Sequence, residues 1–129
     1  MPITLYFTAV LALFYIYLTL NVINLRKSER VAIGSGDSKV LARAIRVHAN
    51  FAEYVPLTLV LLYFLETQHA NPTIMWILSS LLIIARLVHA YGVRAVQEQL
   101  KFRVFGMFTN ISIIVVAAIY ILLIGAGVV

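Results

Sequence analysis

The sequence contains no cysteine and has little charge. Of its 129 residues, 12% are charged and 63% are hydrophobic, and the mean hydropathy is +0.99. The absence of cysteine excludes a disulfide framework, a zinc–thiolate site and a protein thiol nucleophile, so any reactive sulfur must come from a ligand. The low charge excludes a water-soluble globule of this length. The composition is that of an integral membrane protein.

Acidic residues are the scarcer of the two charge types. Five Asp and Glu stand against ten Lys and Arg, which gives a net charge of +5. Most of the basic residues fall in two clusters between apolar segments, which is typical of charges that set membrane topology. The clusters are Arg26, Lys27, Arg30, Lys39, Arg43 and Arg46, and then Arg94, Lys101 and Arg103. We expect no nucleic-acid partner, because the chain has neither a soluble basic face nor a nucleic-acid-binding motif.

The apolar runs predict four membrane helices, at about residues 2–25, 39–66, 72–94 and 104–127, within a single domain 1–129. The first run lacks charge altogether, and a helix of about 25 residues rises about 37 Å, enough to cross a hydrocarbon core of about 30 Å. It has no signal-peptide features, so we expect it to be retained. The expected fold class is an all-α integral membrane four-helix bundle with up-down topology.

The connections between these segments predict the orientation in the membrane. The first connection, residues 26–38, and the third, residues 95–103, are basic, whereas the second, residues 67–71, is a short turn. With four crossings the first and third connections lie on one side. The positive-inside rule places that side in the cytosol and both termini on the opposite side.

The second segment carries a polar stripe near its start. Arg43, Arg46, Asn50 and Glu53 are spaced three, four and three residues apart, which confines them to about 80° of a helix surface. A charged residue at mid-membrane costs about 2.5 to 3.5 kcal/mol, and each apolar residue returns only about 0.3 to 0.6 kcal/mol. The stripe must therefore face other protein or trapped water, whereas His48 points elsewhere.

The third segment repeats this pattern with Arg86 and His89, which lie three residues apart on one face near the same end of the bundle. Arg86 and Glu53 occupy similar depths in neighbouring helices. We predict that they pair or share a ligand, because an unpaired buried carboxylate costs several kcal/mol.

Two interpretations of these polar residues stay open. They form either a network that only fixes helix packing or a ligand site. Three arginines, Arg43, Arg46 and Arg86, outnumber the single Glu53, and this surplus of positive charge favours a ligand with carboxylates or a thiolate. His89 alone fits a core histidine or a ligand contact equally well.

The run RAIRVHANFAEYVPL at residues 43–57 resembles the signature of the MAPEG family, the membrane-associated proteins of eicosanoid and glutathione metabolism. The pattern is an arginine, a histidine two residues on, an asparagine two further on, then a glutamate and a proline, all at the start of a second membrane helix. The runs ARLVH at 85–89 and RVFGM at 103–107 add to the resemblance. The resemblance covers nearly the whole chain.

The resemblance implies a homotrimer of four-helix subunits that binds glutathione between subunits near the cytosolic face. It implies glutathione as the cofactor and a lipophilic small molecule and the lipid bilayer as partners, with no metal. The small size and short loops resemble bacterial members, which implies a bacterial inner membrane, or an ER-type membrane in a eukaryote. The implied glutathione-binding residues are Arg26, Arg43, Arg46, Asn50, Glu53, Tyr54, Arg86 and His89.

The implied activity is that of a glutathione transferase acting on lipophilic electrophiles. A free thiol has a pKa of about 8.5, and lowering it by about two units requires about 2.7 kcal/mol of preferential thiolate stabilisation. Arg103 is the candidate for this role, and Lys101 is the alternative. The eicosanoid synthases of the family have a tyrosine four residues after the position of His89, where this chain has Val93, with Tyr91 nearby.

A different class of function also fits the residues. In that alternative the chain is a non-enzymatic membrane protein whose polar stripe binds a small anionic ligand or a partner helix.

Overall fold

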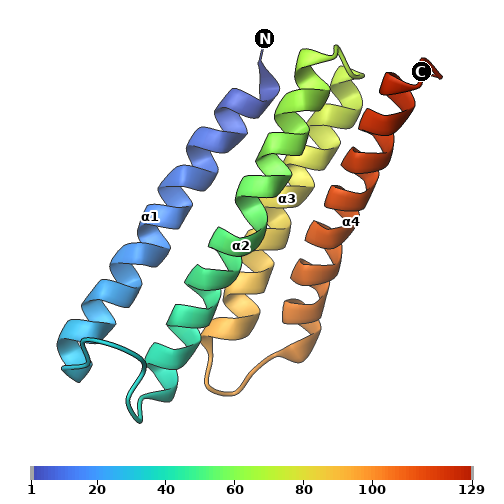
Figure 1. The fold of residues 1–129 in the computed structure, drawn as a ribbon. Helices are drawn as coiled ribbons and strands as arrows, with labels where there is room; N and C mark the ends of the chain where they lie inside the picture. Colours follow the sequence, from blue (N-terminus) through green and yellow to red (C-terminus); the bar gives the residue numbers. More distant parts are fainter. Residues whose placement is uncertain (1, 129) are drawn as a thin grey trace.

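The computed structural model describes residues 2–128, so Met1 and Val129 of the expected domain 1–129 lie outside the described residues. The chain forms an up-down bundle of four helices (Figure 1). These are α1 (Ile3–Glu29), α2 (Lys39–Thr67), α3 (Pro72–Arg94) and α4 (Leu100–Gly125). No strand occurs within this range. The expected all-α four-helix fold is confirmed, and the trimer stays a prediction.

All four helices are long and apolar enough to cross a membrane. The shortest, α3, has 23 residues and so rises about 34 Å. Large apolar side chains point outward from the bundle, among them Leu13, Phe108 and Leu122, each at least 70% exposed. Such a surface is stable only where lipid is the solvent, so the chain is an integral multi-pass membrane protein.

The helices are arranged with α1 and α4 at opposite edges (Figure 1). α3 packs on α4 and α2, α1 packs on α2 and α3, and the backbones of α1 and α4 make no contact over the described residues. Both termini lie at one end of the bundle, and the connections 30–38 and 95–99 lie at the other (Figure 1). The cytosolic placement of those connections stays a prediction.

The first helix continues past the expected membrane span and ends at Glu29. Its last turn is polar, so the helix can extend beyond the apolar segment into water without burying a charged side chain in lipid. Arg30 adopts a left-handed conformation with φ 56°, and its N–H donates to the Arg26 carbonyl. The Arg26 guanidinium donates to carbonyls of the following loop, including that of Gly34 at 2.8 Å, so Arg26 organises this connection.

The fourth helix begins at Leu100, four residues before the expected span at 104. The prediction that the third connection runs to Arg103 is therefore wrong, because residues 100–103, which include Lys101 and Arg103, form the first turn of the helix. Arg103, Gly106, Met107 and Asn110 follow a three-to-four-residue spacing, which puts them on one face of α4. Arg103 is thus held by a helix.

Polar side chains tie the helices together at two levels. Glu66, near the end of α2, accepts from the backbone N–H groups of Ile3 and Thr4, the latter at 3.0 Å, so a carboxylate caps the positive end of α1. Within the bundle, the Asn110 amide of α4 donates to the Thr58 hydroxyl of α2 at 2.9 Å. Each contact joins residues that are more than fifty positions apart in the sequence.

His48 links α2 to α1, away from the polar stripe. Its ring stacks on Tyr15 with centroids 4.8 Å apart, and its Nε2 lies 3.1 Å from the Thr19 hydroxyl. The expectation that His48 points elsewhere than the stripe is confirmed. A 100° step per residue places His48 on the far side of α2 from Asn50.

Two glycines permit the close approach of α3 and α4. A Cβ on Gly106 would lie 2.6 Å from the Ala85 carbonyl oxygen and 2.6 Å from the His89 Cβ. A Cβ on Gly92 would lie 2.7 Å from the Arg103 backbone nitrogen. Small residues at such a contact let helix backbones pack closely in membranes, so each helix contributes one glycine to the crossing.

We predict that Gly106→Ala destabilises the protein in detergent by about 1 to 3 kcal/mol, because the added methyl group forces α4 away from α3. Gly125→Ala is the matched control, since a Cβ there meets nothing within 4 Å. Reversible denaturant unfolding followed by circular dichroism measures both. Equal unfolding free energies for the two variants would contradict the close approach at Gly106.

Candidate functional site

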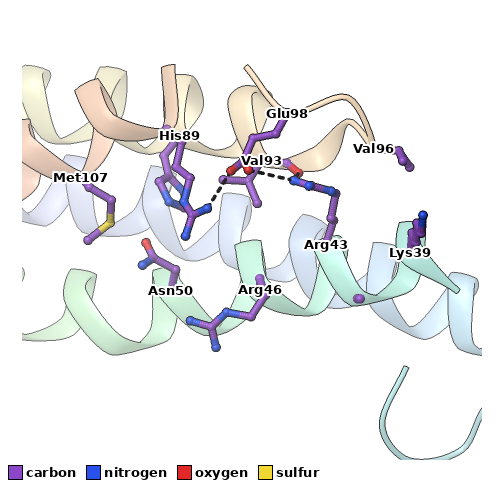
Figure 2. Close-up of a pocket in the computed structure, with 11 residues that line it drawn as sticks. Lys39, Arg43, Arg46, Asn50, His89, Val93, Val96, Glu98 and Met107 are labelled. Carbon is purple, nitrogen blue, oxygen red and sulfur yellow. Dashed lines mark hydrogen bonds and ion pairs between the residues drawn. The ribbon is translucent and has the colours of Figure 1, made fainter. Parts of the chain in front are cut away.

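A cavity of about 570 Å³ opens between α2, α3 and α4 at the end of the bundle that carries the connections 30–38 and 95–99 (Figure 2). Its size is typical of small-molecule sites, which range from about 300 to 1,000 Å³. The lining residues are Lys39, Ala42, Arg43, Arg46, Asn50, His89, Val93, Val96, Glu98, Arg103 and Met107.

The cavity brings together residues that the sequence singled out separately. Arg43, Arg46 and Asn50 come from the stripe on α2, His89 comes from α3, and Arg103 comes from the first turn of α4. The helical spacing of the α2 residues directs one row of side chains into the space between the other two helices. Arg43 and Asn50 are therefore partly covered by protein, whereas Arg46 and Glu53 of the same stripe are more than half exposed in the single chain.

Arg86 lies behind this cavity and is almost completely buried, at 2% exposed. Its guanidinium donates to the Asn50 side-chain oxygen at 2.8 Å and to the Gly106 carbonyl at 3.4 Å, and its Nε has no hydrogen-bond partner. All these partners are neutral. Because the Asn50 oxygen accepts from Arg86, the NH₂ of the same amide is the group that remains to donate to a ligand.

The predicted direct pair between Glu53 and Arg86 is wrong. The Glu53 carboxylate lies 3.9 Å from the Arg46 guanidinium instead, with the two side chains 53% and 63% exposed. Glu53 lies at the edge of the stripe, outside the cavity lining, and the donors of Arg86 are directed to Asn50 and Gly106. That Glu53 and Arg86 share a ligand stays a prediction.

Two further candidates, Tyr54 and Arg26, also lie outside the cavity lining of a single subunit. Tyr54 follows Glu53 on α2 and is half-buried, and its carbonyl accepts from the Thr58 hydroxyl at 2.8 Å. Arg26 is bonded to the carbonyls of its own loop. Tyr91 packs edge-on against Phe102 at 5.6 Å, away from this lining.

The sequence reasoning missed Glu98, which bridges two arginines across the cavity. Its carboxylate lies 2.8 Å from the Arg103 guanidinium and 3.7 Å from the Arg43 guanidinium, which also donates to the Val93 carbonyl at 3.2 Å (Figure 2). The available signal was a lone acidic residue in the basic run AVQEQLKFR. Lys39 was also not predicted as a site residue, although it lies four residues before Arg43 and therefore on the same face of α2.

The cavity has a surplus of positive charge. Lys39, Arg43, Arg46 and Arg103 line it against one carboxylate, that of Glu98. The hydrogen bond from Arg103 holds the pKa of the Glu98 carboxyl below its usual range, and the charge of Arg43 lowers it further. No three His, Asp or Glu side chains cluster as metal ligands among residues 2–128. The arrangement is suited to an anion with more than one charged group.

Comparison with known proteins identifies the family. The model of the MAPEG family matches residues 4–123. The chain belongs to the MAPEG family. The match includes every residue that lines the cavity.

Two curated relatives in this comparison are both named inner membrane protein YecN, from Escherichia coli strain K12 and from Escherichia coli O6:H1. Each is 38% identical to this MAPEG chain over 81 residues. The match covers 63% of this chain and 62% of the length of each relative. No solved structure matches the chain significantly.

The Glu98 bridge predicts a pH dependence of stability. Because the Glu98 pKa is lowered in the folded chain, its ionised form stabilises the fold above the ordinary glutamate pKa of about 4.3, and this contribution is lost as the pH falls through the folded value. We expect the melting temperature to fall less steeply for Glu98→Gln than for wild type between about pH 5 and about pH 3.

Glu29→Gln is the control for this titration, since it removes the same charge from the exposed end of α1. Its melting temperature should follow the wild-type slope. Parallel curves for wild type and Glu98→Gln would show that the bridge does not form in solution.

Proposed function

We propose that this MAPEG chain is a membrane-bound glutathione-dependent transferase that activates the glutathione thiol for attack on a lipophilic electrophile. The single observation that carries the proposal is the cationic cavity in the membrane bundle, built from residues of three helices. The family includes glutathione transferases, which supports the same reading. The names of the relatives support a bacterial inner membrane. Four candidate spans support our proposal that residues 1–129 form one membrane domain.

The chemistry of glutathione fits the residues of the cavity. Glutathione carries two carboxylates, an ammonium group and a thiol, and it is a net anion at neutral pH. Arg43 and Arg46 supply guanidinium groups for the carboxylates, and the Asn50 amide NH₂, oriented by Arg86, donates a further hydrogen bond. The cavity volume of about 570 Å³ accommodates a ligand of this size.

Glutathione supplies the thiol, which the cysteine-free chain lacks. Arg103 is our candidate for stabilising the thiolate, and its position in the cavity lining at the start of α4 supports this role. Lys101 does not line the cavity and packs over Phe102 at 5.0 Å, which favours Arg103 of the two candidates. A cation in a partly dry pocket is able to supply the required preference for the thiolate.

We further propose that the active form is a homotrimer whose subunit contacts cover Glu53 and Tyr54. The charged pair Arg46–Glu53 is more than half exposed on a membrane-spanning helix of the single chain. Lipid contact with these charges is costly, so another subunit is needed to cover them. This burial would bring Glu53 towards a neighbouring cavity, where its carboxylate can take the ammonium group of glutathione. Native mass spectrometry in detergent tests the stoichiometry, and a monomer would contradict it.

The binding step is tested with Asn50→Ala. We expect the variant to lose at least about tenfold in glutathione affinity, because it loses a donor and leaves Arg86 without its shortest hydrogen bond. Isothermal titration calorimetry on purified protein in detergent measures this, and glutathione should raise the melting temperature of wild type. A wild-type protein that binds no glutathione at millimolar concentration would instead favour the non-enzymatic alternative.

The chemical step is tested with Arg103→Ala. We expect turnover of a general electrophile to fall about 100-fold, the equivalent of about 2.7 kcal/mol, and the thiolate ultraviolet absorbance to disappear, with glutathione binding largely retained. Lys101→Ala is the matched control, with the same charge removed from the same helical turn. If Lys101→Ala loses turnover and Arg103→Ala keeps it, the assignment of the two residues is reversed.

A further inference from the structure

Glu98 occupies the position between the two cationic sides of the cavity. Its two carboxylate oxygens divide between them, with Oε1 at 2.8 Å from Arg103 of α4 and Oε2 at 3.7 Å from Arg43 of α2. A ligand anion that bridges the same two guanidinium groups competes with this carboxylate for them. The arrangement is that of an anion site whose occupant belongs to the chain itself.

The backbone around Glu98 has few attachments. Glu98 lies in the connection 95–99, which has no regular secondary structure. Gln99 ties this connection to the helices, because its N–H donates to the Gly92 carbonyl at 3.4 Å and its carbonyl accepts from the N–H groups of Phe102 and Arg103 at 3.1 and 3.4 Å. The Glu98 side chain is partly exposed, at 22%. Leaving its two arginines therefore requires a local change of side chain and loop rather than a repacking of helices.

Without Glu98, five cationic groups would face one another around the cavity with no counter-charge from its lining. Four of them line the cavity, and Arg86 lies immediately behind. The other charged and titratable groups of the lining are Lys39, Arg43 and Arg46 from α2, His89 from α3 and Arg103 from α4, and none of them is acidic. A resident carboxylate reduces this repulsion while no ligand is bound.

We propose that Glu98 is a resident anion that a ligand must displace from Arg43 and Arg103, so that this residue determines which anions the site accepts. A ligand with one weak anionic contact does not compete with a carboxylate that is already in place. A ligand whose anionic groups engage both arginines does compete, and it replaces Glu98 as the partner of Arg103. For glutathione the proposal rests on the function proposed above, and it names how the same site is regulated.

The test uses Glu98→Gln, which keeps the size of the side chain and removes its charge. We expect this variant to bind sulfate about tenfold more tightly than wild type at neutral pH and low ionic strength, and to bind glutathione more tightly by a similar factor. Isothermal titration calorimetry in detergent measures both ligands. A merely structural role for Glu98 predicts weaker binding, because the cavity would lose its cross-link.

Glu29→Gln is the matched control, because it makes the same change of net charge in an exposed residue outside the cavity lining. Its sulfate and glutathione affinities should equal those of wild type. Unchanged or weaker sulfate binding in Glu98→Gln would overturn the proposal, as would an equal gain in the Glu29→Gln control.

The two ligands separate this proposal from the proposed function. If sulfate binding tightens while neither wild type nor variant binds glutathione, the resident-anion proposal stands and the transferase function fails. If both proteins bind glutathione and sulfate with the same affinities, the proposal fails and the function stands. Should Glu98→Gln not fold, Glu98→Asp replaces it, because the shorter side chain cannot reach both arginines. It should tighten sulfate binding about threefold, and an unchanged affinity would overturn the proposal.

Discussion

The arrangement of the bundle depends on one buried guanidinium group. Arg86 lies eight residues before the end of α3, which puts it about 12 Å along the helix from the cytosol-facing end that we predict. An arginine in a membrane helix must find protein partners, and here its donors meet α2 at Asn50 and α4 at Gly106. The contact with a backbone carbonyl is possible only because a glycine lets α4 approach α3 closely. Three helices are thus held together around a single charge, and the cavity opens beside it.

This constraint explains why the polar residues separate into distinct roles. Arg86 and Asn50 are oriented by each other, so they form a fixed wall of the cavity. Arg43 and Arg103 are held by Glu98, which comes from a connection with few other contacts. The fixed wall belongs to helices and the adjustable contact belongs to a loop, a division that is common in ligand sites.

Much of the fold and part of the site were predictable from the sequence. Hydropathy and charge clusters identify four membrane helices, because a lipid environment allows few alternatives for a long apolar run. Helical spacing predicted that Arg43, Arg46 and Asn50 share a face, and the cavity contains all three. Spacing gives the direction of a side chain but not its reach, which is why Glu53 was paired with the wrong arginine. The position of Glu98 could not be predicted, because a connection has no helical periodicity from which to infer the helices that its side chain contacts.

The capping of α1 by Glu66 has a consequence for how the chain assembles during synthesis. The carboxylate that satisfies the first N–H groups of α1 lies near the end of α2, more than sixty residues later in the chain. The N-terminal amides of α1 can therefore gain this carboxylate only after α2 has been made almost to its last residue and lies beside α1. The start of the first helix thus depends on the end of the second for its hydrogen bonds.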